Sequence, residues 1–214
     1  ASYGTLGVAA STSATGSGDA NTLRGAVAYA ESTENFTVTG GTGSALFWAT
    51  YTVDGSWTSN GANLDLELTY SVNNGPGAIA YRIQAAGSPS IYFNQGFPYP
   101  GGYVPSLPGL SVTANSVTGS TDISFWVAFD FGTAFDLTTA LYAGAVPGGT
   151  TSGTIDFLST ARLTGIEIIQ GSSSWSGFSI QSGSGTQYTA QGAVVPLPAA
   201  IWMLGSGLGV LGGW

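Results

Sequence analysis

The chain has 214 residues and a formal net charge of −8, so it is long enough to bury a core of its own. Charged residues make up only 7% of the sequence, far below the usual quarter. The cationic residues are three arginines, and the sequence contains no lysine or histidine. Too few cations are present to neutralise a phosphate backbone, which excludes nucleic acid as an expected partner.

The composition also excludes several kinds of catalytic and metal site. Without histidine or cysteine, zinc loses its usual ligands, and Ser/His/Asp or Cys/His nucleophiles cannot form. Without lysine there is no Schiff base and no phosphate-loop lysine. We therefore expect a protein that is not an enzyme and has no resident cofactor.

The N-terminal part divides into two predicted regions. Residues 1–20 are small and polar, which indicates an extended segment ahead of a domain over residues 21–192. The sequence begins at Ala1, from which we expect a removed signal peptide and an extracellular or cell-surface location. In residues 21–31 (NTLRGAVAYAE) the spacing of Leu23, Val27 and Ala30 favours a short helix over an edge strand.

The rest of the domain has a period of two. Residues 64–70 (LDLELTY) alternate leucines with polar groups, as in a half-buried antiparallel strand. Similar runs cover residues 44–53, 78–85, 110–117, 123–131, 153–157, 161–169 and 175–180. Turn signals separate them, among them Asp54-Gly55 and Asn73-Asn74-Gly75-Pro76. This pattern predicts an all-β antiparallel sandwich or a jelly-roll-like domain.

Two sets of carboxylates are candidates for chemistry. Asp65 and Glu67 point to the same face of a strand, as a glycosidase pair would, but the solvent face of a half-buried strand is the favoured interpretation. Asp130 and Asp136, with Asp122 and Asp156 not far along the chain, offer oxygen ligands for Ca²⁺. Their spacing does not match an EF-hand loop, so structural aspartates are the favoured alternative.

Several aromatic residues fall in or beside predicted turns. Trp57, Tyr99, Tyr103 and Trp175, with Tyr92, could stack on sugar rings, although core packing or subunit contacts are the commoner role. Trp48 and Trp126 lie inside apolar runs and are predicted to be core residues.

The C-terminal region, residues 193–214, is unlike the rest. Residues 199–214 are apolar and uncharged, and would reach about 24 Å as a helix, slightly short of a bilayer core. Gly205 and Gly209 match the small-xxx-small pattern of closely packed helices. We expect a short helical tail, with a buried hairpin or core helix of the same domain as the alternative.

Val195, Pro196, Leu197, Pro198 and Ala199, followed by Trp202, resemble the VPLPA-type form of the PEP-CTERM sorting tail. Residues 162–167 and 178–188 are similar to the closing strands found in such proteins. The resemblance implies export and handling by an exosortase in a Gram-negative bacterium that makes exopolysaccharide. It also implies a role at the surface or in a biofilm matrix.

These features lead to two functional hypotheses. In the first, copies of the chain self-assemble into an extracellular filament or surface layer, with the apolar tail or the N-terminal segment making the contacts between subunits. In the second, the chain is a polysaccharide-binding module that its tail anchors to the cell surface. Exopolysaccharide is then the expected partner.

Overall fold

The computed structural model describes residues 5–13, 25–85, 89–93, 102–104, 108–146, 151–188 and 194–195. In this part of the chain every regular element is a β-strand, and most strands belong to two antiparallel sheets. No helix in the described ranges is long and apolar enough to cross a membrane. The all-β prediction is confirmed for these residues.

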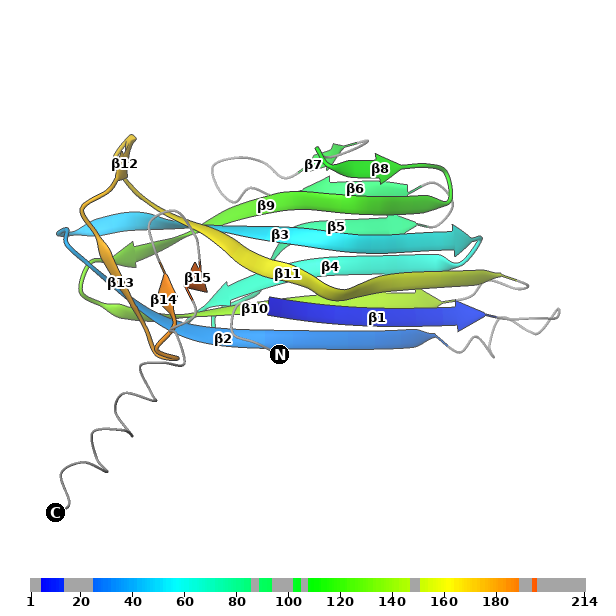
Figure 1. Cartoon of the computed structure of the whole chain (residues 1–214), viewed down its shortest axis with the longest axis horizontal. Coiled ribbons are helices and arrows are strands. Elements are labelled where there is room, and N and C mark those ends of the chain that lie inside the picture. The colour runs from blue at the N-terminus through cyan, green and yellow to red at the C-terminus, as the bar shows by residue number, and fades with distance from the viewer. Residues whose placement is uncertain are drawn as a thin grey trace, which may run out of the picture.

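The first sheet has the strand order β1-β11-β3-β9-β8, and β12 pairs with the C-terminal end of β11 (Figure 1). Its strands are β1 (Thr5–Ser13), β3 (Ser44–Asn60), β8 (Leu110–Val112), β9 (Ser116–Asp130), β11 (Ser152–Gln170) and β12 (Ser173–Trp175). The N-terminal segment is therefore extended where it is described, as β1, and it pairs with β11 over Thr5–Ser13.

The second sheet has the order β13-β2-β10-β4-β5-β6-β7. Its strands are β2 (Ala26–Thr39), β4 (Asn63–Val72), β5 (Ala78–Ala85), β6 (Pro89–Phe93), β7 (Gly102–Val104), β10 (Ala134–Val146) and β13 (Ser179–Ser182). A small pair, β14 (Gln187–Tyr188) with β15 (Val194–Val195), lies with β12 and β13 at one end of the molecule (Figure 1).

Aromatic rings from the two sheets meet in a shared core. Phe47 of β3 packs against Phe36 of β2 with ring centroids 5.0 Å apart. Phe125 of β9 stacks on Tyr70 of β4 at 4.0 Å. Burying these large apolar surfaces between the sheets supplies the main stabilisation of the fold.

The period-two pattern of residues 64–70 is confirmed by strand β4. Leu64, Leu66 and Leu68 are buried in the core, while Asp65 and Glu67 face outward from the sheet. The turn predicted after this strand is also present. Asn73 and Asn74 both have positive φ, 50° and 56°, and the Gly75 amide donates to the Val72 carbonyl oxygen at 2.8 Å. Positive φ at both central residues matches the tight turns that suit hairpins.

The helix predicted over residues 21–31 is wrong for its described part, which is the start of strand β2. Ala26, Ala28 and Ala30 pack against the core, and Val27 and Tyr29 are exposed. β2 pairs with β10 in an unbroken register from Ala26 to Thr37. These cross-strand hydrogen bonds outweigh the weak helical spacing of a few apolar residues.

The turn predicted at Asp54-Gly55 is also wrong, because β3 continues through it to Asn60. Gly55 lies opposite Gly119 of β9, and both have positive φ, 156° and 126°. Such a conformation suits glycine, and the β3–β9 register continues through it without a break. The neighbouring β3–β11 register shifts at this point, between Asp156 and Ala161 of β11. The consequence is that Trp57 lies within a strand.

A buried carboxylate ties the C-terminal strands to the second sheet. Glu34 of β2 accepts hydrogen bonds from the backbone N of Ser184 at 3.0 Å and from its Oγ at 2.6 Å. Beyond this loop, Tyr188 inserts into the core edge-on to Phe36, at 5.3 Å between ring centroids. The loop therefore closes the core at the end of the molecule where β12 and β13 lie (Figure 1).

Candidate functional site

A short hairpin at the end of β11 creates a pocket on the outer face of the first sheet. β11 turns back into β12 through Gly171, whose φ of 67° is one that other residues rarely adopt. β12 pairs with Ile168–Gln170 of β11, on the edge opposite to β3. The pocket thus crosses β11, with β3 on one side and the hairpin on the other.

The pocket has a volume of about 470 Å³ and combines aromatic with polar groups. It is lined by Trp48, Thr50, Gly165, Ile166, Glu167, Ser174, Trp175, Ser176 and Phe178. Gly165 contributes backbone alone, and a β-carbon at this position would lie 3.1 Å from Cβ of Thr50. A residue with a larger side chain would therefore fill part of the pocket.

Polar groups in and beside the pocket are held by neighbouring side chains. Ser174 Oγ donates to Glu167 Oε1, which orients the carboxylate. Thr50 Oγ1 lies 2.9 Å from Ser124 Oγ of β9. Thr52 Oγ1 lies 2.9 Å from Thr164 Oγ1, so hydroxyl groups continue over the sheet beyond the pocket. Aromatic rings beside hydroxyls and one carboxylate suit a ligand with flat apolar faces and many hydroxyl groups.

The aromatic predictions have different outcomes. Trp175 is 40% exposed and lines the pocket, as a stacking residue must. Trp57 is 0% exposed, so its interpretation as a sugar contact is wrong, because β3 carries it into the core. Tyr99 lies outside the described residues, and Tyr103 lies in β7, where only the backbone is described, so both stay predictions.

The prediction that Trp48 and Trp126 are core residues is wrong. Both are only partly buried, and they alternate with the buried residues Phe47 and Phe125. They therefore lie on the outer face of the first sheet, opposite each other in the β3–β9 register. Trp48 and Phe178 also line the pocket, although the sequence pattern places both inside predicted strands.

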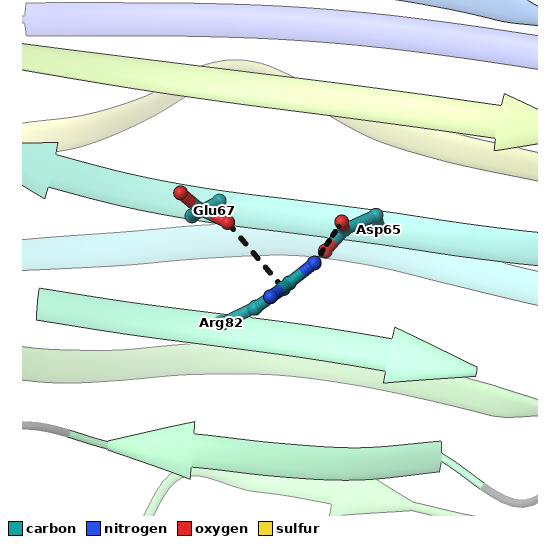
Figure 2. Close-up of polar contacts among 3 residues, drawn as sticks. All are labelled: Asp65, Glu67 and Arg82. Carbon is teal, nitrogen blue, oxygen red and sulfur yellow. Dashed lines mark hydrogen bonds and ion pairs between the residues drawn. The ribbon is translucent and has the colours of Figure 1, made fainter. Parts of the chain in front are cut away.

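Asp65 and Glu67 lie on the outer face of the second sheet and share one cation, Arg82 of β5 (Figure 2). Arg82 donates from Nε and Nη2 to the two oxygens of Asp65 at 3.0 and 2.7 Å, and its Nε lies 3.3 Å from Glu67 Oε2. Because the guanidinium occupies the space between the carboxylates, the geometry favours a structural ion-pair cluster over a hydrolytic pair.

Partial burial raises the pKa of Glu67, Arg82 opposes this by lowering it, and the neighbouring Asp65 raises it. A raised folded-state pKa means that the folded protein binds the proton more tightly, so stability falls as pH rises through this range. Arg82 thus limits the cost of ionising Glu67 at neutral pH.

We expect the Arg82→Ala variant to lose about 1–2 kcal/mol of unfolding free energy at pH 7. The loss should shrink in acid, because protonation of Glu67 removes a negative charge that Arg82 compensates. Urea unfolding at several pH values measures it, with Arg162→Ala, an exposed arginine of β11, as the matched control. A loss that is equal at pH 3 and pH 7 would contradict the cluster's electrostatic role.

The proposed calcium ligands take separate partners. Asp130 accepts from Ser44 Oγ at 2.6 Å, and Asp136 accepts from Asn35 Nδ2 at 2.7 Å. Asp122 accepts from Thr52 Oγ1 at 2.6 Å. In the described ranges, no three acidic side chains are grouped so that they could hold a metal ion. Calcium binding therefore gains no support from the geometry.

The sorting motif falls almost wholly outside the described residues. Val195 belongs to β15, where it lies opposite Gln187. Outside the described residues lie the other predicted motif and tail residues, which are Pro196, Leu197, Pro198, Ala199, Trp202, Gly205 and Gly209. The helical tail and its glycine contacts stay predictions.

Comparison of the chain with protein-family models, with curated proteins and with solved structures found no match. The resemblance to PEP-CTERM proteins therefore rests on the sequence itself, in residues 195–202 and in residues 162–167 and 178–188.

Proposed function

We propose that the chain is a polysaccharide-binding protein whose site is the pocket between Trp48 and Trp175. The observation that carries this proposal is that two tryptophans from distant parts of the sequence line one surface pocket together with hydroxyl groups. Indole rings stack on the C–H faces of sugars, while hydroxyls and a carboxylate exchange hydrogen bonds with sugar hydroxyls.

Binding without cleavage is the activity that this lining supports. Glycoside hydrolysis uses two carboxyl groups that flank the bond to be broken. Glu167 is the one carboxylate among the described residues that line the pocket. The protein would therefore hold a polysaccharide in place and leave it intact.

The Trp175→Ala variant tests the site directly. We expect a loss of about tenfold or more in affinity for the bound glycan, because removing a stacked ring forfeits on the order of 1–2 kcal/mol of apolar contact. Glycan arrays followed by titration calorimetry measure the effect. Tyr29→Ala is the control, since Tyr29 is 60% exposed on the outer face of the other sheet. Unchanged binding by Trp175→Ala would reject this site.

Self-assembly is a second proposal, and an exposed apolar patch favours it. Val27, Tyr29 and Val146, which we call the β2/β10 patch, are 66%, 60% and 39% exposed. Tyr29 lies opposite Tyr142 in the register of the two strands. The patch and the apolar residues 199–214 could cover each other between copies, hiding both from water.

Sedimentation of the full chain and of a chain that ends at Pro198 tests self-assembly. We expect the full chain to form polymers that the shorter chain does not form. Val27→Thr with Val146→Thr should weaken the same polymers while the fold is kept. If the shorter chain forms identical polymers, the tail does not make the contact between subunits.

Predictions from the sequence about the strand connections, the tail and the location of the protein complete the proposed function. We propose jelly-roll-like connections, a helical tail, and export as a PEP-CTERM-like surface or biofilm-matrix protein. An extracellular location would bring the pocket to exopolysaccharide, and fractionation of the source cells tests it.

A further inference from the structure

A cross-strand row on the outer face of the first sheet contains two tryptophans and reaches the pocket. Trp126 of β9 lies opposite Trp48 of β3, which lies opposite Glu167 of β11. Trp175 of β12 lies one residue along from this row, opposite Ile168 on the far edge of β11, and it lines the pocket together with Trp48. Four neighbouring strands in the order β12-β11-β3-β9 therefore place Trp175 and Trp126 on either side of Trp48. Three strand spacings are about 14 Å, longer than one sugar ring.

Hydrogen-bonding groups accompany this row. Thr50 and Ser124, two residues along from Trp48 and Trp126, share a hydrogen bond at 2.9 Å between their hydroxyls. These hydroxyls face the same side as the tryptophans, because alternate residues of a strand share a face. A chain of sugars that lay on the indole rings would meet hydroxyl partners beside them.

The charge of this sheet selects against an acidic ligand. Arg162 is the one cation among the described residues of the sheet. Its carboxylates are Asp54, Asp122, Asp130, Asp156 and Glu167. With a net charge of −8 over the whole chain, a polyanionic polysaccharide would be repelled from this face.

We propose that Trp126 forms a second stacking subsite, and that the ligand is an uncharged polysaccharide lying across β11, β3 and β9. This inference rests on the proposed function of the pocket. At least three sugar units are needed to reach from Trp175 past Trp48 to Trp126. The affinity therefore grows with the length of the oligosaccharide until the row is covered.

The test is calorimetry with neutral oligosaccharides of two to six units, made from β-glucan, mannan and galactan, beside oligogalacturonate of the same lengths. For the neutral glycan that binds, we expect Trp126→Ala to lose about tenfold in affinity for the six-unit chain, from the apolar ring area that a sugar covers. Binding of the two-unit chain should change less than about twofold. Trp126→Phe should restore part of the loss, and Tyr29→Ala should leave both affinities unchanged. Circular dichroism confirms that each variant is folded.

The outcomes separate this inference from the proposed function. If no glycan binds, or if Trp175→Ala binds the glycan as tightly as the parent protein does, the pocket is rejected as a binding site. The inference about Trp126 is then rejected as well. If binding needs Trp175 but Trp126→Ala binds the six-unit chain normally, the second subsite is rejected and the pocket stands. Tighter binding of oligogalacturonate than of every neutral chain would overturn the choice of an uncharged ligand.

Discussion

Replacing Trp57 with alanine is expected to lower the free energy of unfolding by about 3–5 kcal/mol. The indole is 0% exposed and lies between Val117 of β9 and Ile155 of β11 in the register of the first sheet. Alanine would leave a large cavity among three strands that cannot close around it. Urea unfolding followed by circular dichroism measures the loss.

Trp57→Phe is the informative companion variant. Among the described residues, the Trp57 Nε1–H has no hydrogen-bond acceptor. A buried donor without a partner costs about 1–3 kcal/mol, so phenylalanine removes that cost while it loses some packing. We expect it to lose less than half as much stability as alanine. A loss below about 1 kcal/mol for Trp57→Ala would show that the ring does not fill the core.

The second large effect is expected at alkaline pH. Burial raises the pKa of Tyr51 to about 12, and it also raises the pKa values of Tyr81 and Tyr188. Because the folded protein holds these protons more tightly than the unfolded chain, the stabilisation is complete below about pH 10 and is lost as pH rises toward the folded values. A shift of two units for one phenol corresponds to roughly 3 kcal/mol.

Absorbance at 295 nm and circular dichroism, recorded together against pH, check this expectation. The phenols of Tyr51, Tyr81 and Tyr188 should ionise only as the β-sheet signal is lost. Tyr51→Phe should unfold at higher pH than the parent, because one titrating group is gone, although it loses the 3.2 Å hydrogen bond to Thr139. Ionisation of all ten tyrosines near pH 10 with an unchanged sheet signal would contradict their burial.

The sequence predicts the β-strands well where apolar and polar residues alternate strictly. Leu64, Leu66 and Leu68 can face only one way, so strand β4 and its buried side follow from the pattern alone. The aromatic run in β3 is different, since both Phe47 and Trp48 are apolar and the pattern does not say which is inside. The packing of β3 against the second sheet decides this, and it buries Phe47 against Phe36 of β2.

The candidate site depends still more on long-range pairing. Trp48 and Trp175 are 127 positions apart by their residue numbers, and the pocket exists because β11 brings the two segments together. The position of Trp175 beside a predicted turn is enough to mark it as a candidate stacking residue. Trp57 has the same sequence signal but is buried, because β3 continues through Asp54-Gly55. Turn residues at a distortion within a strand look the same in sequence as those of a true turn.

The indole N–H signals in a ¹H–¹⁵N NMR titration test the central claim most directly. The chain has six tryptophans, so each indole gives a separate reporter. On addition of the glycan selected by the array, we predict that the signals of Trp48 and Trp175 shift and that of buried Trp57 does not. Saturable shifts confined to other residues, with Trp48 and Trp175 unmoved, would contradict the claim that this pocket binds polysaccharide.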